Sequence, residues 1–409
     1  MHPSREQLRQ KAAAAANKPA AIGADIDLSQ FDRTVTVGPQ LAETELCSLP
    51  QADLDRMLLA GVDVNSPERG GTYIMKDTSI MHCSSRQEGV EVLPIRQALE
   101  HHPWIWDYYW KAVAVDADKY TAAVELDLHD GYVIRALPGS HTIYPIQACL
   151  YMEREKLQQN VHNIIIAEEG SELHIISGCV TSEKMHSGVH AGVSEFYIKK
   201  GAKLSFTMIH NWAEEMLVRP RSAAFVEEGG LFLSNYICMK PVRSLQMYPT
   251  AHLIGPDAVA RFYSIMVGTP TTDIDAGSRV ILNHPGCRAE IVSRSITNGG
   301  KIMARGHLVG NAPDIKAHLE CRGLLLGGGA MLAVPQLDGF VDGVEMSHEA
   351  AVGKIAQEEI LYLMSRGLSE DEATATIVRG FLSVDIPGLP AQLQAEIDRA
   401  VQATDQDAM

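Results

Sequence analysis

The sequence predicts a mainly β protein whose core is a β-helix of stacked short strands, flanked by N-terminal α/β and C-terminal α-helical regions. Short apolar strands recur around turns of two charged residues and a glycine, in "NIIIAEEGSELHIIS", "EFYIKKGAKLSFTMI" and "AAFVEEGGLFLSNYI". The turn glycines are Gly170, Gly201 and Gly229, so the repeat is 31 and then 28 residues long. No helical pattern separates these strands, which argues against a doubly wound α/β fold.

A repeat of this length in short strands is typical of a solenoid, because each unit can bury its apolar face only by stacking on its neighbours. Weaker echoes of the same unit follow in "AHLIGPDAVARFYSIM" and "RVILNHPGCRAEIVSRSI". A β-sandwich is the competing architecture, since hairpin turns would produce a similar spacing.

Three regions are expected along the chain. Residues 1–115 form a mixed helical domain, with helices at "LPQADLDRMLLAGV" and at "LPIRQALEHHPWIWDYYW", where Pro103 interrupts the second one. Residues 116–340 form the β-helix core, and residues 341–409 form a helical domain.

In the C-terminal domain Ser347 is expected to cap a helix through "HEAAVGKIAQEEILYLMSR", which carries an apolar stripe. Gly367 stands where a helix commonly ends in a left-handed residue. Ser369 and Glu372 then match a capping box at the start of a second helix. A third helix is expected to reach about Gln402.

Composition limits the classes of function. The chain has 409 residues, 46% of them hydrophobic, and a net charge of −16, which argues against a broad nucleic-acid interface. No apolar run reaches about 18 residues, so no transmembrane helix is expected. The N-terminus does not resemble a signal peptide, and the expected location is the cytoplasm.

Seven cysteines are spread along the chain, and the closest pair, Cys149 and Cys179, is 30 residues apart. This spacing excludes a local zinc or ferredoxin-type motif, and the odd number argues against a disulfide framework. Most of the thiols are therefore interpreted as small buried hydrophobes. The chain also lacks the phosphate-binding G-x-x-x-x-G-K-[ST] motif, so it is not expected to hydrolyse ATP itself.

Two stretches resemble a known family. "SHEAAVGKIAQEEILYLMSRGLSEDEATATIVRGFL" and "DGYVIRALPGSHTIYPIQACLYME" are similar to the SufB/SufD proteins, scaffolds of the SUF system for iron–sulfur cluster assembly, and the short chain looks like their compact archaeal or minimal-system members. The resemblance covers residues 120–385. It implies a right-handed parallel β-helix that acts as a non-catalytic scaffold. It also implies a homodimer, or a heterodimer with a SufD-like chain, through the late strands, and a SufC-type ABC ATPase bound to the C-terminal helices.

The resemblance also implies a metal site. Cys321 in "AHLECRGLLLG" and His348–Glu349 in "MSHEAAVG" stand where SufB proteins carry a thiol and a His-Glu pair, and SufD proteins typically lack the thiol. A transient, nascent iron–sulfur cluster is expected on Cys321 and Glu349, with His348 as an alternative ligand or a positioning residue. Thiolates hold such clusters, and nitrogen or oxygen ligands make them easier to release.

A sulfur-transfer role is implied for Cys179 in "IISGCVTS" and Trp212 in "MIHNWAEE". Here the sequence departs from the family, because His210 replaces a glutamine, and Tyr151 and Glu153 stand where the family has an arginine and an asparagine. A purely structural role for Cys179 is an equal alternative. The sequence identifies neither the sulfur donor nor whether reduced flavin binds.

A β-solenoid enzyme acting on carbohydrate is the alternative function. Such enzymes present clustered carboxylates on an exposed sheet face. The strand repeats contain no closely spaced Asp/Glu set apart from the turn residues, which favours the scaffold.

Overall fold

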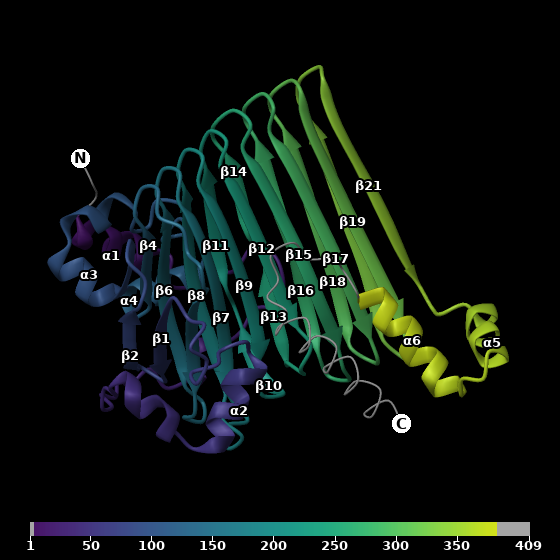
Figure 1. Ribbon diagram of the computed structural model, residues 1–409, viewed down its shortest axis with the longest axis horizontal. Coiled ribbons are helices and arrows are strands. Elements are labelled where there is room, and N and C mark those ends of the chain that lie inside the picture. The colour runs from purple at the N-terminus through teal and green to yellow at the C-terminus, as the bar shows by residue number, and fades with distance from the viewer. Residues whose placement is uncertain (1–3, 383–409) are drawn as a thin grey trace.

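The computed structural model describes residues 4–382 and consists mainly of two long sheets that face each other along one axis (Figure 1). From residue 132 onward the chain passes alternately through the two sheets, and its strands pair in parallel with the strands one turn before and after them. The predicted β-solenoid is therefore confirmed, and the β-sandwich alternative is wrong. A sandwich of hairpins would pair its neighbouring strands antiparallel.

The first sheet contains ten strands, and only its β1–β2 pair is antiparallel. Its order is β2 (Ser79–Ser85), β1 (Gly71–Lys76), β5 (Ile146–Met152), β7 (Glu172–Thr181), β9 (Lys203–Asn211), β12 (Leu231–Cys238), β15 (Val259–Gly268), β17 (Arg288–Thr297), β19 (Ile315–Leu325) and β21 (Val344–Gly353).

The second sheet begins with an antiparallel pair, β3–β4, and its later pairs are parallel. Two of its turns are interrupted near Pro220 and Pro249, so each contributes two short strands. The strands are β3 (Val90–Pro94), β4 (Tyr132–Ala136), β6 (Gln158–Ala167), β8 (Ser187–Ile198), β10 (Glu215–Val218), β11 (Arg221–Val226), β13 (Ser244–Met247), β14 (Thr250–Leu253), β16 (Asp273–Leu282), β18 (Lys301–Gly310) and β20 (Ala330–Gly339).

The repeat glycines occupy the turns, as expected. Gly170, Gly201 and Gly229 have φ angles of 66°, 65° and 63°, a left-handed conformation that glycine adopts without a steric penalty. Along each strand the side chains alternate between the interior and the outer face, because successive residues of a strand point to opposite sides. The inward side chains of both sheets form one continuous apolar core.

Helices cover parts of both outer faces. The second sheet packs against α1 (Arg5–Ala14), α3 (Ile95–His101), α4 (Lys119–Leu126) and the 3₁₀ turn Pro103–Asp107. The first sheet packs against α2 (Gln51–Leu59). Two further 3₁₀ turns span Leu28–Gln30 and Glu43–Ser48. Buried Glu195 of β8 anchors the N-terminal cover, because its carboxylate accepts backbone N–H bonds from Trp110, Ala112 and Val113 at 2.7, 2.6 and 3.0 Å.

The C-terminal region differs from the expectation at its start. The helix predicted from Ser347 is wrong for its first half, because residues 344–353 form β21, the last strand of the first sheet. Their side chains continue the ladder of β19, and this tertiary pairing overrides the local helical pattern. The solenoid therefore extends past residue 340, and α5 (Gln357–Ser365) begins only after it.

The second C-terminal helix, α6 (Glu370–Leu382), has the predicted capping box. The Ser369 Oγ accepts from the Glu372 N–H at 3.2 Å, and the Glu372 carboxylate accepts from the Ser369 N–H at 2.8 Å. Val378 and Leu382 of this helix pack on the outer face of the first sheet. The third expected helix lies outside the described residues.

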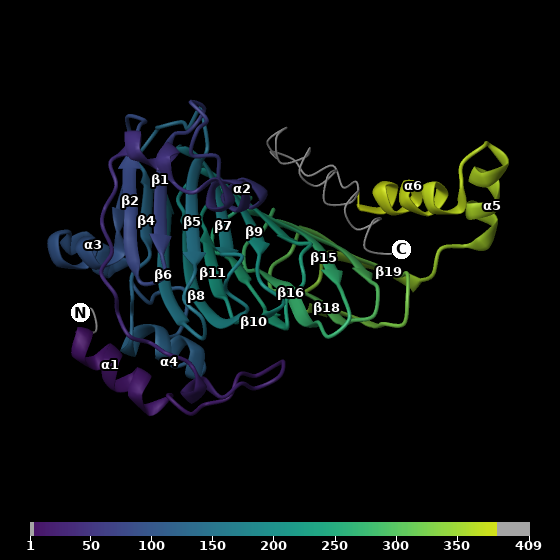
Figure 2. The same ribbon diagram turned by 90° about the horizontal axis from the view of Figure 1, so that it is seen from below.

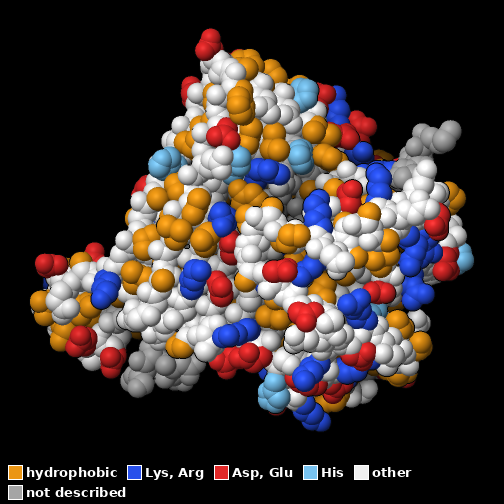
Figure 3. All heavy atoms as spheres, turned by 180° about the vertical axis from the view of Figure 1, so that it is seen from behind, with side chains coloured by type: hydrophobic (Ala, Val, Ile, Leu, Met, Phe, Trp, Pro, Cys, Tyr) orange, Lys and Arg blue, Asp and Glu red, His pale blue; other side chains and the backbone are white. Residues whose placement is uncertain are grey.

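Charged residues of both signs are interspersed on the face shown in Figure 3. Several form ion pairs between neighbouring turns, such as Lys199–Glu227 at 2.9 Å and Lys200–Glu228 at 3.0 Å. Within the described residues, no helix combines the length and apolar character required to cross a membrane.

Candidate functional site

Cys321 lies on β19, the strand next to the end of the first sheet, and its side chain points into the solenoid. Burial alternates along this strand, with Leu319 and Cys321 inside and Arg322 outside, and Cys321 is only 1% exposed. Burial raises the pKa of the Cys321 thiol to about 11, with Glu320 adding to the rise and Arg294 opposing it. In the isolated chain this cysteine is therefore a shielded, protonated thiol.

His348 and Glu349 lie on β21 and point to opposite sides of the sheet. His348 pairs with inward-facing Leu319, and Glu349 pairs with outward-facing Glu320. The Arg322 guanidinium lies between the two carboxylates, 2.6 Å from Glu320 and 2.9 Å from Glu349. The expected helix start beside Glu349 is wrong, so this carboxylate gains nothing from a helix dipole.

A single chain does not bring the predicted ligands together. By strand alternation, Cys321 shares the inward side with His348, whereas Glu349 lies on the outer side. Within residues 4–382 no group of three or more His, Cys, Asp or Glu side chains is arranged to hold a metal ion. A cluster on these residues would need ligands from a second chain.

The end of the solenoid beside this thiol is open. β20 and β21 each have a neighbouring strand on one side only, and most of their residues are partly or fully exposed, in contrast to the buried inner turns. Four large apolar side chains are exposed on or next to these strands: Leu332, Phe340, Val341 and Val352. Helices α5 and α6 lie to the side of the solenoid, so none of the residues that the structure describes caps this end (Figure 2).

Cys179 lies in the interior on β7 and is fully buried. Its thiol is 3.5 Å from the Met208 sulfur. Its backbone pairs with His210 of β9, which pairs in turn with Cys238 of β12. These three inward side chains therefore stack in one column, and burial raises the pKa of both thiols, that of Cys238 to about 12.

Trp212 follows β9 and packs beside this column. Its ring centroid is 5.1 Å from that of His190 and 5.3 Å from that of His210. The buried indole Nε1 has no hydrogen-bond partner. Burial lowers the pKa of His190 to about 3 and that of His210 well below its usual value, so both imidazoles are neutral.

Tyr151 and Glu153 do not join this interior group. Tyr151 lies in the outer cluster between the first sheet and the N-terminal region, where its hydroxyl donates to Asp53. Glu153 forms an ion pair with Lys76 at the surface. The two positions that depart from the family pattern therefore leave the interior without an additional charge.

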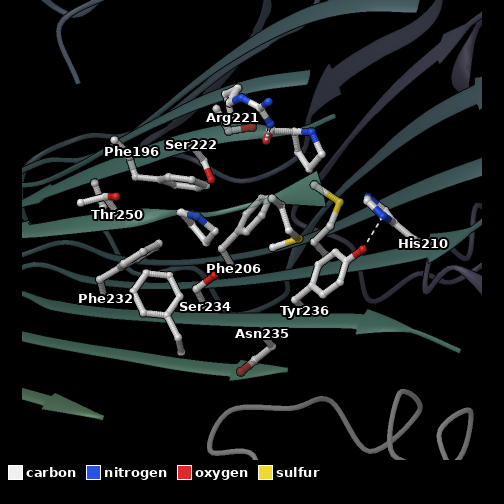
Figure 4. Close-up of a pocket in the computed structure, with 18 residues that line it drawn as sticks. Phe196, Phe206, His210, Arg221, Ser222, Phe232, Ser234, Asn235, Tyr236 and Thr250 are labelled. Atoms are coloured by element: carbon white, nitrogen blue, oxygen red, sulfur yellow. Dashed lines mark hydrogen bonds between the residues drawn. The ribbon is translucent and has the colours of Figure 1, made fainter. Parts of the chain in front are cut away.

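Tyr236 completes the interior group. The Tyr236 hydroxyl and His210 Nδ1 are 2.8 Å apart. Both line an interior cavity of about 60 Å³, whose other walls include Phe196, Phe206 and Phe232 (Figure 4). Tyr236 also shares one inward ladder with Ser264, Ser293 and Cys321, so polar side chains continue from this group toward the open end.

The sequence contained a signal for this column that motif reasoning missed. Cys179, His210 and Cys238 each stand nine residues after a turn glycine, since 179 − 170, 210 − 201 and 238 − 229 are all 9. Equal offsets from equivalent turns place side chains at the same height and on the same side of a solenoid. Cys238 could therefore have been recognised as a partner of Cys179.

The fold and the site define a class: a parallel β-solenoid with an interior thiol column, an open end beside a buried cysteine, and two C-terminal helices. Residues 150–381 match the family described as "SUF system FeS cluster assembly, SufBD core domain". The chain belongs to the SufBD family of iron–sulfur cluster assembly proteins, as its sequence motifs indicated.

Relatives from archaea and bacteria support this assignment. An iron-sulfur cluster assembly SufBD family protein of Methanothermobacter thermautotrophicus (strain Winter) is 48% identical over 95% of this chain and 96% of its own. One from Archaeoglobus fulgidus is 49% identical over 87% of this chain and 96% of its own. A Staphylococcus aureus (strain MRSA252) member is 31% identical over 79% of this chain and 70% of its own. The resemblance to compact archaeal members is confirmed.

Proposed function

We propose that this chain is a SufB-type scaffold on which an iron–sulfur cluster is assembled as the product, in the cytoplasm, with a SufC-type ATPase as its partner. The observation that carries this proposal is the end of the solenoid that residues 4–382 leave uncapped, because Cys321, a buried thiol, lies one strand away from that edge. Family membership favours cluster assembly over the carbohydrate-active alternative.

In this proposal the cluster forms between two chains. An unpaired, flat strand edge with exposed apolar side chains is an aggregation hazard that proteins usually cover. A second copy, or a SufD-like chain, would cover β20 and β21 and bring its own ligands to Cys321, Glu349 and His348. A two-fold axis duplicates every ligand, which supplies the set that one chain lacks.

Iron chemistry fits these residues. A bound metal ion lowers the pKa of a coordinating thiol, so iron would deprotonate Cys321 despite its burial. Glu349 would have to leave the Arg322 guanidinium to bind iron. A mixed set of thiolate, carboxylate and imidazole ligands holds a cluster less firmly than four thiolates do, which suits a scaffold that must release its product.

Two other parts of the chain take the remaining roles. The ATPase would dock on α5, where Leu361 and Tyr362 are 54% and 58% exposed. Sulfur would enter the interior at Cys179, with Trp212 and the two neutral histidines packed around it. ATP-driven movement of the partner would then open the shielded Cys321 site.

Anaerobic reconstitution with ferrous iron and sulfide tests the proposal. The wild-type chain, with its ATPase partner, should bind iron and sulfide and develop visible cluster absorbance, which Mössbauer spectra would assign. Cys321→Ser should lose this absorbance while it keeps the wild-type circular dichroism. Cys287→Ser removes another fully buried thiol from the core and should behave as wild type. Normal iron and sulfide content in Cys321→Ser would refute the assignment.

A further inference from the structure

Two serine hydroxyls are buried inside a late turn of the solenoid without a hydrogen-bond partner. Ser293 and Ser295 lie on β17 and are 4% and 0% exposed, and within the described residues neither Oγ is paired. A buried polar group that stays unpaired costs free energy, so each of these hydroxyls needs an explanation. For Ser293 the explanation lies in its neighbour on the next strand.

Ser293 stands directly beside Cys321. The parallel register of β17 and β19 pairs the two residues, and strand alternation points both side chains into the solenoid, as it does for Ile291 and Leu319 two residues earlier. On its other side Cys321 pairs with Ala350 of β21. Of the two residues in register with Cys321, only Ser293 therefore carries a polar side chain.

The two side chains are close enough to interact. Neighbouring strands lie about 4.8 Å apart, so a change between staggered rotamers brings the Ser293 Oγ within hydrogen-bond reach of the Cys321 Sγ. A thiol sulfur is only a weak acceptor, which leaves the hydroxyl without a good partner in the iron-free chain. A sulfur bound to iron is a thiolate, and its negative charge makes it a stronger acceptor.

We propose that Ser293 is a positioning residue that donates a hydrogen bond to the Cys321 sulfur when iron binds there. This inference rests on the proposed scaffold function and adds a residue that no sequence motif marks. The hydroxyl holds the sulfur in one rotamer and offsets part of its charge inside an apolar core. Hydrogen bonds of this kind strengthen metal binding and tune the reduction potential of a cluster.

Ser295 provides a comparison within the same strand. It is also an inward-facing, unpaired serine, but its register partner is Gly323, which has no side chain. Two residues along a strand correspond to about 6.6 Å, which puts the Ser295 hydroxyl beyond hydrogen-bond reach of Cys321. The two serines therefore share their burial and their chemistry and differ in their distance from the thiol.

The test compares variants of the full chain after anaerobic reconstitution with ferrous iron and sulfide, with the ATPase partner present. Ser293→Ala should lose iron to a chelator about tenfold faster than the wild type, because removal of a group that orients a metal ligand commonly weakens binding by about that factor. The reduction potential of the cluster should also fall, since a hydrogen bond to sulfur stabilises the more negative, reduced state. Ser295→Ala should keep the wild-type rate and potential.

A second pair of variants isolates the hydroxyl from the shape of the side chain. Ser293→Thr keeps the hydroxyl, whereas Ser293→Val has nearly the same shape as threonine without it. The threonine variant should hold iron as the wild type does, and the valine variant should lose it as fast as Ser293→Ala.

Thermal unfolding of the iron-free protein distinguishes positioning from a structural role. Ser293→Ala removes a buried polar group that has no partner, so its unfolding temperature should equal or exceed that of the wild type. A serine that served only the fold would instead lower this temperature when replaced, and that result would count against the proposal.

The remaining outcomes separate this inference from the scaffold function. A wild-type rate and potential in Ser293→Ala, or an equal effect of Ser295→Ala, would overturn the role of Ser293 and leave the scaffold function intact. Rapid iron loss from Ser293→Thr would overturn it as well, because the hydroxyl would then not be the group that matters. A normal cluster in Cys321→Ser would overturn the proposed site itself.

Discussion

Glu349 is a single residue with two competing partners, the Arg322 guanidinium in the chain and the proposed iron. Its side chain is 55% exposed, and its ion pair with Arg322 is a surface contact of small energetic value. Releasing the carboxylate to a metal ion would therefore cost the fold little.

Glu349→Gln should let a chelator remove iron from the reconstituted cluster about tenfold faster, because a neutral amide is a weaker ligand than a carboxylate. Loss of visible absorbance after chelator addition measures the rate. Glu345→Gln is the matched control, since Glu345 lies on the same strand and pairs with Lys316 at 3.0 Å. Equal rates in the two variants would exclude Glu349 as a ligand.

Because of its buried histidines, the protein should have a free energy of unfolding that depends on pH. The folded pKa of His190, about 3, lies below its unfolded value of 6.5, so this residue contributes stability above pH 6.5. That contribution is lost as the pH falls toward 3, because the unfolded chain binds the proton first.

The contribution of His190 to the free energy of unfolding should fall by about 1.4 kcal/mol per pH unit between pH 6.5 and 3. In urea titrations at pH 6 and pH 4.5, His190→Gln should remove this histidine's share of the pH dependence of the free energy of unfolding. His141→Gln changes a largely exposed imidazole and should keep the wild-type slope. An unaltered slope in His190→Gln would mean that this imidazole is not held neutral.

At the scale of elements, α5 and α6 differ in how they bury their apolar side chains. Helix α6 buries Val378 and Leu382 against the first sheet, whereas α5 leaves apolar side chains in solvent. The partly buried Phe381 also packs on the sheet, so the docking surface expected from the helix pair narrows to α5.

Leu361→Asp and Tyr362→Asp should weaken binding of the ATPase by about tenfold or more, since loss of a central interface anchor costs about 2 kcal/mol or more. Co-elution and titration calorimetry measure the affinity. Glu359→Ala on the same helix is the control. Because α6 and its buried contacts are untouched, both aspartate variants should keep the wild-type thermal unfolding, and undiminished binding by them would rule out α5 as the docking site.

At the scale of the whole molecule, the two ends of the solenoid are unequal. The N-terminal end finishes in antiparallel strands and is covered by helices, whereas the C-terminal end exposes β20 and β21. A long uncovered edge is the feature by which two chains would associate.

Phe340→Arg and Val352→Arg should convert the assembly to monomers of 44.6 kDa, because a two-fold interface places each new charge twice. Light scattering at micromolar concentration, with the ATPase present, measures the mass of the complex, from which the mass of the bound ATPase is subtracted. Ile143→Arg replaces an apolar side chain that is 81% exposed elsewhere on the surface, and it should leave the wild-type mass unchanged. A wild-type monomer under these conditions would contradict the proposal.

The sequence by itself determined the solenoid, its repeat, its turn glycines and the family. These features follow from local periodicity, and each turn repeats the same signal. Local capping chemistry likewise predicted the start of α6 at Ser369. The column of Cys179, His210 and Cys238 was also present in the spacing, although it had to be read from the turn glycines instead of a motif.

Only the tertiary structure decided the surroundings of the candidate ligands. The stretch from Ser347 has a helical pattern, yet it becomes β21 because pairing with β19 satisfies its backbone and continues the sheet. That pairing turns Glu349 outward and His348 inward, which no local pattern specifies. The uncapped end likewise depends on where α5 and α6 pack, a long-range outcome of burying α6 on the first sheet.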